Sequence, residues 1–165
     1  MLCRTFCLPY QLMRLSARQV FNVDKTAIWQ LLMNAESLAA IIPGIKKLEV
    51  TSSNTFISLA EIKLGPVNSS FHGIVELDEI IEYSSFTLKA RQESKIGNGN
   101  ATIKIRLVTK NELQTEVDFS GDLMLTGLLA GMGQRIIGGV VNTLTKQFFS
   151  NLERQLENKP YPEEI

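Results

Sequence analysis

Residues 112–141 read ELQTEVDFSGDLMLTGLLAGMGQRIIGGVV, and within this stretch the spacing of the apolar residues changes from that of a strand to that of a helix. Apolar and polar residues alternate up to Leu123, which places one face of a strand in water and the other face in a core. From about Leu125 to Leu156 the apolar residues recur at helical spacing. The stretch therefore predicts a one-sided sheet that is covered by one long helix.

The predicted helix carries glycines where a plain packing helix would carry alanine. Gly131 and Gly133 lie in its first turns, and Gly138 and Gly139 form a pair where a kink can occur. Each interior glycine costs about 0.5–1 kcal/mol relative to alanine. Close backbone approach, a hinge or space for a ligand would offset this cost. If the glycines preserve a cavity or a hinge, leucine at Gly133 or Gly138 should weaken ligand uptake more than folding.

The alternation of apolar and polar residues extends back along the chain. The predicted strands cover about 14–23, 45–52, 55–64, 67–80, 84–94, 101–109 and 112–123, and the short connections imply an antiparallel meander. Asp24 stands at the N-cap of a short helix that runs to Met33. A second short helix over 36–41 ends before Pro43. The predicted fold class is α+β, with a curved antiparallel sheet of about seven strands, two short helices after the first strand and a long C-terminal helix.

Length and composition predict one folded domain. The chain has 165 residues, of which 44% are hydrophobic, and this is ample for a single core. We expect residues 1–12 to be a disordered N-terminal extension, 13–157 to be the domain and 158–165 to be a C-terminal tail. No stretch approaches the roughly 20 uninterrupted apolar residues that span a bilayer. The prediction is a cytoplasmic protein.

The charge balance and the cysteines argue against two kinds of partner. Basic and acidic side chains number 17 each, so the positive field that holds a nucleic-acid backbone is missing. Cys3 and Cys7 are too few for a disulfide framework. A metal site would need further ligands, and His72, the one histidine, lies far along the chain. We predict neither nucleic-acid binding nor a metal site.

Several polar motifs fit a sheet better than a catalytic site. The run Gly97–Asn100 lies between two strands and opens no helix, so a hairpin turn is favoured over a phosphate loop. His72 alternates with Phe71 and should face solvent or the sheet edge. The acidic residues Glu76, Asp78, Glu79 and Glu82 fit a solvated strand edge. We predict no catalytic residue.

Six short motifs follow one another in a recognisable order. They are Ile42-Pro43-Gly44, Leu64-Gly65-Pro66-Val67, Phe71-His72-Gly73-Ile74-Val75-Glu76-Leu77, Gly97-Asn98-Gly99-Asn100-Ala101, the run Leu129 to Ile137, and Phe148-Phe149. In this order they resemble the CoxG-like family, which is named for the G subunit of carbon monoxide dehydrogenase. The order of elements resembles the helix-grip fold of the START and birch-pollen-allergen (Bet v 1-like, SRPBCC) superfamily. The resemblance covers about Met13 to Leu156.

The resemblance implies a non-catalytic binding domain with an apolar cavity between the sheet and the long helix. It also implies service to a molybdenum hydroxylase of the carbon monoxide dehydrogenase type, in recruitment or maturation, with contact to the membrane surface through that enzyme. The implied ligand is a lipid-like molecule or a quinone, and no cofactor is required. The candidate lining residues are Trp29, Phe71, Phe86, Leu88, Ile105, Phe119, Leu128, Met132, Gly133, Ile136 and Val140.

Two other interpretations remain open at this point. A cyclase or hydrolase of the same superfamily would act inside the cavity, and an interaction subunit would fill the cavity with its own side chains. The inward-facing polar residues are Gln92, Ser94, Thr115 and Gln19, which can orient a ligand but include no convincing base or nucleophile. Trp29 fits either the core or the mouth of a pocket. The sequence leaves the oligomeric state open.

Overall fold

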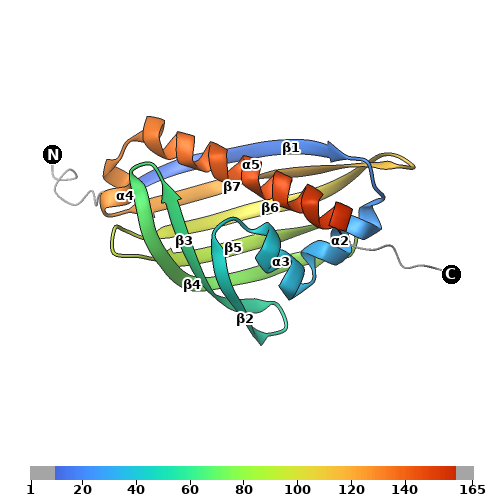
Figure 1. Cartoon of the computed structure of the whole chain (residues 1–165), viewed down its shortest axis with the longest axis horizontal. Helices are drawn as coiled ribbons and strands as arrows, with labels where there is room; N and C mark the ends of the chain where they lie inside the picture. The colour runs from blue at the N-terminus through green and yellow to red at the C-terminus, as the bar shows by residue number, and fades with distance from the viewer. Residues whose placement is uncertain (1–9, 159–165) are drawn as a thin grey trace.

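Seven strands form one antiparallel sheet that curves around a long helix (Figure 1). The computed structural model describes residues 10–158. In chain order the elements are β1 (Tyr10–Phe21), α2 (Lys25–Leu32), α3 (Ala35–Ile41), β2 (Ile45–Ser52), β3 (Thr55–Leu64), β4 (Val67–Ile81), β5 (Ser85–Glu93), β6 (Gly99–Asn111), β7 (Gln114–Thr126), α4 (Leu128–Gly131) and α5 (Gln134–Asn158). The strand order β1-β7-β6-β5-β4-β3-β2 confirms the predicted meander, with β1 added at the β7 edge.

For the six strands after β1, the predicted boundaries agree closely with the observed ones. Each of the six later strands begins and ends within three residues of the expected position. At the N-terminus the expectation was wrong for residues 10–12, because Tyr10, Gln11 and Leu12 pair with Thr126, Leu125 and Met124 of β7 and so belong to the sheet. The rest of the predicted extension, with Cys3 and Cys7, and residues 159–165 of the predicted tail lie outside the described residues.

The two short helices begin at the polar residues that cap them. Asp24 is extended and accepts a hydrogen bond from the Thr26 backbone N–H at 3.1 Å, which confirms the predicted N-cap of α2. Hydrogen bonds from Thr26 lower the pKa of Asp24. Asn34 caps α3 in the same way through the Ser37 N–H. The Asn151 side chain then donates to the Ile41 carbonyl at 3.0 Å, which ties α3 to α5.

The long helix begins later than the helical spacing predicted. Strand β7 runs on to Thr126, a one-turn helix α4 follows, and α5 begins only at Gln134. The break falls at Gly133, whose φ of +88° lies in the left-handed region that side chains disfavour. The Gly133 carbonyl accepts the first bond of α5, from the Ile137 N–H at 3.1 Å. The expectation of one helix from residue 125 was therefore wrong.

Two glycines within strands allow the sheet to curve. A Cβ atom at Gly73 would collide with the backbone carbonyl oxygen of Arg91 on β5, and one at Gly121 would collide with that of Thr102 on β6. Glycine in a strand interior marks such close backbone approach. Gly73 and Gly121 thus permit a close approach of neighbouring strands within the curved sheet of Figure 1.

The core consists of two clusters of apolar side chains. The larger cluster includes Trp29 and Phe86 beside the short helices and an aromatic group of Phe21, Phe119, Phe148 and Phe149. The smaller cluster, at the α4 end, consists of Ala60, Val67, Phe71, Leu125, Leu129 and Ile137. Both clusters lie on the concave side of the sheet, so the packing holds α5 over that face.

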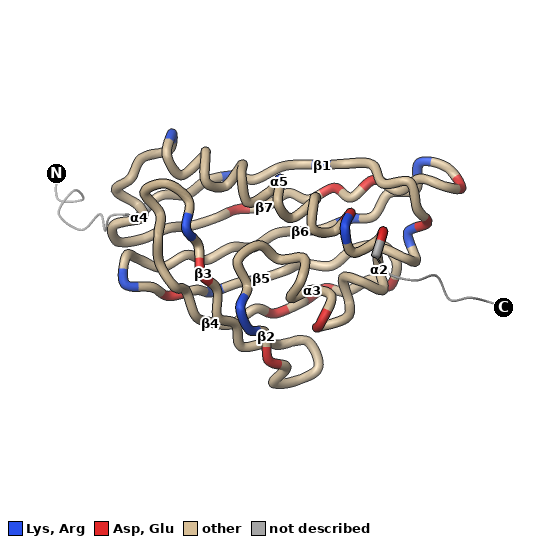
Figure 2. Tube along the Cα trace, viewed as in Figure 1, with Lys and Arg blue, Asp and Glu red and all other residues tan. Residues whose placement is uncertain are grey.

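Charged residues of both signs are spread along the strands, helices and loops (Figure 2). Several pair across neighbouring strands: Lys89 lies 3.0 Å from Asp78, and Arg106 lies 3.0 Å from Asp118. Within residues 10–158, no helix combines the length and apolar character needed to cross a membrane.

Candidate functional site

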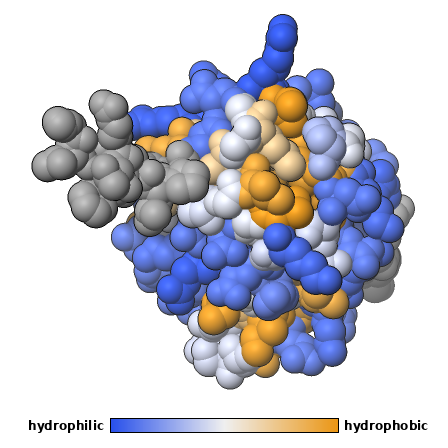
Figure 3. Space-filling view, turned by 90° about the vertical axis from the view of Figure 1, so that its left-hand side faces the viewer, coloured by the Kyte–Doolittle hydropathy of each residue, from blue (hydrophilic) through white to orange (hydrophobic). Residues whose placement is uncertain are grey.

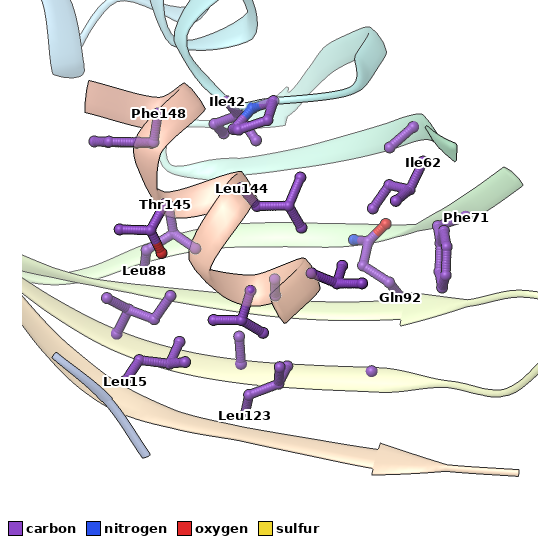
Figure 4. A pocket seen from close by; sticks show the side chains of 18 of the residues that line it. Leu15, Ile42, Ile62, Phe71, Leu88, Gln92, Leu123, Leu144, Thr145 and Phe148 are labelled. Carbon is purple, nitrogen blue, oxygen red and sulfur yellow. The ribbon is translucent and has the colours of Figure 1, made fainter. Parts of the chain in front are cut away.

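An apolar cavity of about 320 Å³ lies between the concave face of the sheet and α5 (Figure 4). The cavity is partly open to solvent, and its lining residues come from both core clusters. One face of α5 covers it, through Ile137, Val140, Val141, Leu144, Thr145 and Phe148. These positions follow the i, i+3, i+4, i+7 pattern of one helix face. The cavity has the size and the apolar lining of a small-molecule pocket, at the lower end of the usual ~300–1,000 Å³.

Small residues on the strands create the space. Ala60, Ala90, Gly99 and Ala101 all line the cavity from the sheet side. Ala90 of β5 pairs directly with Ala101 of β6, and Gly99 lies one inward position further along β6. Large side chains at these positions would reach α5. The cavity therefore arises from a patch of small residues on β5 and β6, with a contribution from β3.

The glycines of the predicted helix do not create the cavity. None of Gly131, Gly133, Gly138 and Gly139 lines it. A Cβ atom at Gly131, Gly133 or Gly139 would meet open space, and one at Gly138 would make ordinary contact with Met13 at 3.9 Å. The left-handed backbone accounts for Gly133, and the sequence had not suggested this explanation.

Gly139→Ala is therefore expected to stabilise the protein and to leave ligand uptake unchanged. The residue lies within α5, where alanine costs about 0.5–1 kcal/mol less than glycine. The gain should appear as a higher free energy of unfolding in urea. A marked loss of ligand uptake in this variant would instead show that α5 needs a hinge at this position.

Five of the predicted lining residues do line the cavity. They are Phe71, Leu88, Ile105, Phe119 and Val140. Trp29 and Phe86 do not, because they pack against each other in the larger core cluster with ring centroids 5.9 Å apart. Trp29 is 5% exposed, so of its two possible roles the structure shows the core role.

The other four predicted lining residues, Leu128, Met132, Gly133 and Ile136, lie in α4, in the break or in the first turn of α5 and do not reach the cavity. Three of them, Leu128, Met132 and Gly133, precede α5, so the helix break explains their positions. Ile136 lies on α5 but beside its inner face, where Ile137 faces the sheet and is buried. Leu128 and Ile136 are 66% and 41% exposed. Figure 3 shows apolar side chains gathered among polar ones on the end of the molecule that α4 occupies.

The cavity contains little polar chemistry. Among the described residues that line it, only Ser58, Gln92 and Thr145 have polar side chains, and none is ionisable. The Ser58 hydroxyl donates to Gln92 Oε1 at 3.1 Å, and Gln92 Nε2 donates to the Ile74 carbonyl at 3.5 Å. Figure 4 shows the Gln92 side chain extending from β5 into the cavity. The lining can orient a polar group of a ligand, but it offers no acid or base.

Of the inward polar residues expected from the sequence, only Gln92 lines the cavity. Ser94 bonds within its own loop, to the Gly97 carbonyl at 2.6 Å. Thr115 donates to the Val23 carbonyl at 2.9 Å, and Gln19 lies outside the lining. His72 faces solvent as predicted, with its side chain 67% exposed and 3.8 Å from Glu93.

Sequence reasoning missed Ser58 and the small residues of the sheet. Ser58 is in phase with Phe56 and Ala60 on β3, so the alternation could have placed it inward. The pairing of Ala90 with Ala101 could not be read without the register. Ile42 and Pro43, in the connection after α3, also line the cavity. In the sequence, these two residues belong to the Ile42-Pro43-Gly44 motif, which supported the family resemblance but did not indicate a place in the site.

The family model for CoxG, the G subunit of carbon monoxide dehydrogenase, matches residues 20–157, which include every element from the end of β1 into the last turn of α5. The chain belongs to the CoxG family. This confirms the resemblance found in the sequence motifs. A comparison with curated protein sequences returned no match.

Several solved structures, among them a START superfamily protein, share the fold of this CoxG family member. A conserved protein from Geobacillus kaustophilus is 23% identical, with a TM-score of 0.85 over 88% of this chain and 95% of that chain. A START superfamily protein from Mycobacterium smegmatis is 12% identical, with a TM-score of 0.71 over 89% and 99%. The Zhui aromatase/cyclase from a Streptomyces species is 11% identical, with a TM-score of 0.69 over 94% and 100%. At these identities the likeness concerns the fold, and it confirms the predicted helix grip.

Proposed function

We propose that this protein is a non-catalytic binding module whose cavity holds a lipid-like molecule or a quinone. The observation that carries this proposal is the apolar cavity under α5. Its walls are built from aliphatic and aromatic side chains of the sheet and the helix, with three polar side chains among them. Such a lining favours a ligand whose surface is mostly hydrocarbon, because burial of apolar surface drives binding.

The energetic cost of the cavity supports an occupied state. At about 24 cal/mol per Å³, a sealed and empty apolar cavity of 320 Å³ would cost about 8 kcal/mol. This is an upper bound for a cavity that is partly open, yet it is comparable with the net stability of a whole domain, about 5–15 kcal/mol. Larger residues at Ala90 or Ala101 would remove the cost. A bound apolar ligand removes it as well, and it stabilises the folded state by mass action.

We further propose that the module serves a molybdenum hydroxylase of the carbon monoxide dehydrogenase type, in recruitment or maturation, and meets the membrane surface through that enzyme. Family membership supports this partner. An accessory role of this kind also suits the balanced surface charge, which favours neither nucleic acid nor an anionic membrane as a direct partner.

An enzyme acting inside the cavity is less well supported. One structural neighbour is an aromatase/cyclase, but the likeness at 11% identity concerns the fold. Acid–base catalysis needs a titratable group within hydrogen-bond reach of the substrate. The described residues that line this cavity include no Asp, Glu, His, Lys, Cys or Tyr.

Purification from native cells tests both parts of the proposal. The tagged protein, isolated in detergent-free buffer, should carry an apolar molecule that solvent extraction and mass spectrometry identify, and a molybdenum hydroxylase should co-purify. Absence of any extractable ligand, together with no uptake of added lipid or quinone, would refute the binding function. Retention of a ligand without any component of the hydroxylase would refute the partner and leave the binding function standing.

A further inference from the structure

Gln92 occupies an unusual place in the sheet, because both of its inward neighbours are glycines. It pairs with Gly73 of β4 on one side and with Gly99 of β6 on the other. Gly73 pairs in turn with Ser58 of β3, so the three residues form a row across three strands. With no side chain at Gly73, the amide of Gln92 reaches across β4 to the Ser58 hydroxyl, 3.1 Å away.

This polar pair is costly in an otherwise apolar cavity. Ser58 is 1% exposed, and a buried hydroxyl or amide without a hydrogen-bond partner loses roughly 1–3 kcal/mol. The bond between Ser58 and Gln92 satisfies the hydroxyl. A pair of apolar residues would fill the same space without polar groups to satisfy.

The Gln92 amide keeps hydrogen-bonding capacity on the cavity side. An amide has two N–H donors and an oxygen with two lone pairs. Among the described residues, the oxygen accepts from Ser58, and the nitrogen has one long bond of 3.5 Å to the Ile74 carbonyl. Gln92 itself is half-buried and lines the cavity. At least one N–H therefore remains for a ligand.

We propose that Gln92, positioned by Ser58, selects an uncharged apolar ligand through one carbonyl or hydroxyl oxygen. This inference rests on the proposed binding function and narrows its ligand class. The amide N–H donates to a carbonyl oxygen. Because the Ser58 hydroxyl can donate or accept, the amide can also turn over and accept from a ligand hydroxyl.

The same geometry disfavours an anionic lipid. A carboxylate or phosphate inside the cavity would lose its hydration, and burial of an unpaired charge is far more costly than burial of a neutral polar group. None of the described lining residues carries a positive charge that would compensate. A neutral oxygen needs only the hydrogen bond that Gln92 offers.

Three probes with the same ring system test this selectivity. They are 2-methylnaphthalene as the hydrocarbon, 2-acetylnaphthalene as the neutral carbonyl compound and 2-naphthoate as the anion. Equilibrium dialysis gives the affinity of each probe for the full chain. We expect naphthoate to bind most weakly. In Gln92→Leu, the affinity ratio of the ketone to the hydrocarbon should fall about 3- to 10-fold, as expected for loss of one neutral hydrogen bond.

Ser58→Ala should lower the same ratio by a smaller factor, because the amide stays but loses its orientation. The double variant Ser58→Ala/Gln92→Leu leaves neither group without a partner and provides the test if a single variant folds poorly. Thr115→Val is the matched control, since it removes a buried hydroxyl whose bond to Val23 lies outside the cavity lining. It should leave the ratio unchanged.

The outcomes separate this inference from the function on which it rests. If the hydrocarbon binds but Gln92→Leu leaves the ratio unchanged, or if naphthoate binds as tightly as the ketone, the role of Gln92 is refuted and the apolar cavity stands. If none of the three probes binds, the proposed binding function fails, and the inference fails with it.

Discussion

Ala101→Leu is expected to weaken ligand binding by at least tenfold while the protein remains folded. Ala101 lies on β6, lines the cavity and pairs with Ala90 on one side and Leu123 on the other. Leucine adds three carbon atoms in the space that a ligand would occupy. Each buried methylene contributes about 0.8 kcal/mol, so the variant should unfold at an equal or higher temperature than the parent.

Thr102→Leu is the matched control for this experiment. It is the next residue along β6, and its side chain is exposed on the opposite face of the sheet. The same residue type is thus introduced one position away, outside the cavity. Uptake of lipid or quinone should be normal in this variant. Equal uptake by Ala101→Leu and the parent would show that ligands bind elsewhere.

Phe149→Ala should lower the free energy of unfolding by about 3–5 kcal/mol, the typical cost of removing a buried phenylalanine ring. Phe149 is 5% exposed and stacks on Phe119, with ring centroids 5.1 Å apart and planes 11° apart. The ring centroids of Phe148 and Phe21 lie 5.9 and 6.1 Å from the ring centroid of Phe149. These contacts attach α5 to β7 and to β1, so their loss should loosen the helix over the whole sheet.

Urea denaturation followed by circular dichroism measures this effect. Leu113→Ala is the control, because Leu113 is 73% exposed in the hairpin between β6 and β7 and should change stability by less than about 0.5 kcal/mol. A loss below 1 kcal/mol in Phe149→Ala would contradict the central role of the aromatic group. The increase in the free energy of unfolding that added ligand produces should be measured for the variant and the parent in the same experiment, since Phe149 does not line the cavity.

The sheet could be predicted because alternation depends only on local sequence. Strand β7 has Val117 and Phe119 buried on one side and exposed Ser120 and Asp122 on the other, as the sequence indicated. The same pattern correctly turned Leu88 and Ile105 toward the cavity. A strand has a period of two, so a small error in its ends does not change which face a residue occupies.

The helix side of the site could not be predicted from spacing alone. Apolar residues recur at helical spacing on both sides of Gly133, and the left-handed backbone there resets the phase between α4 and α5. Within α5, Ile137 rather than Ile136 lies on the inner face. The small residues on the strands were missed for a different reason: their proximity depends on the register between β5 and β6.

The position of β1 has a consequence for how the chain folds. Strand β1 pairs with β7, and about a hundred residues separate the two partners along the chain. The hairpins from β2 to β6 are local and can form early, whereas β1 must wait until β7 has been synthesised. Helix α5 comes later still. The concave face is thus uncovered until α5 has been synthesised, and the cavity forms only after that step.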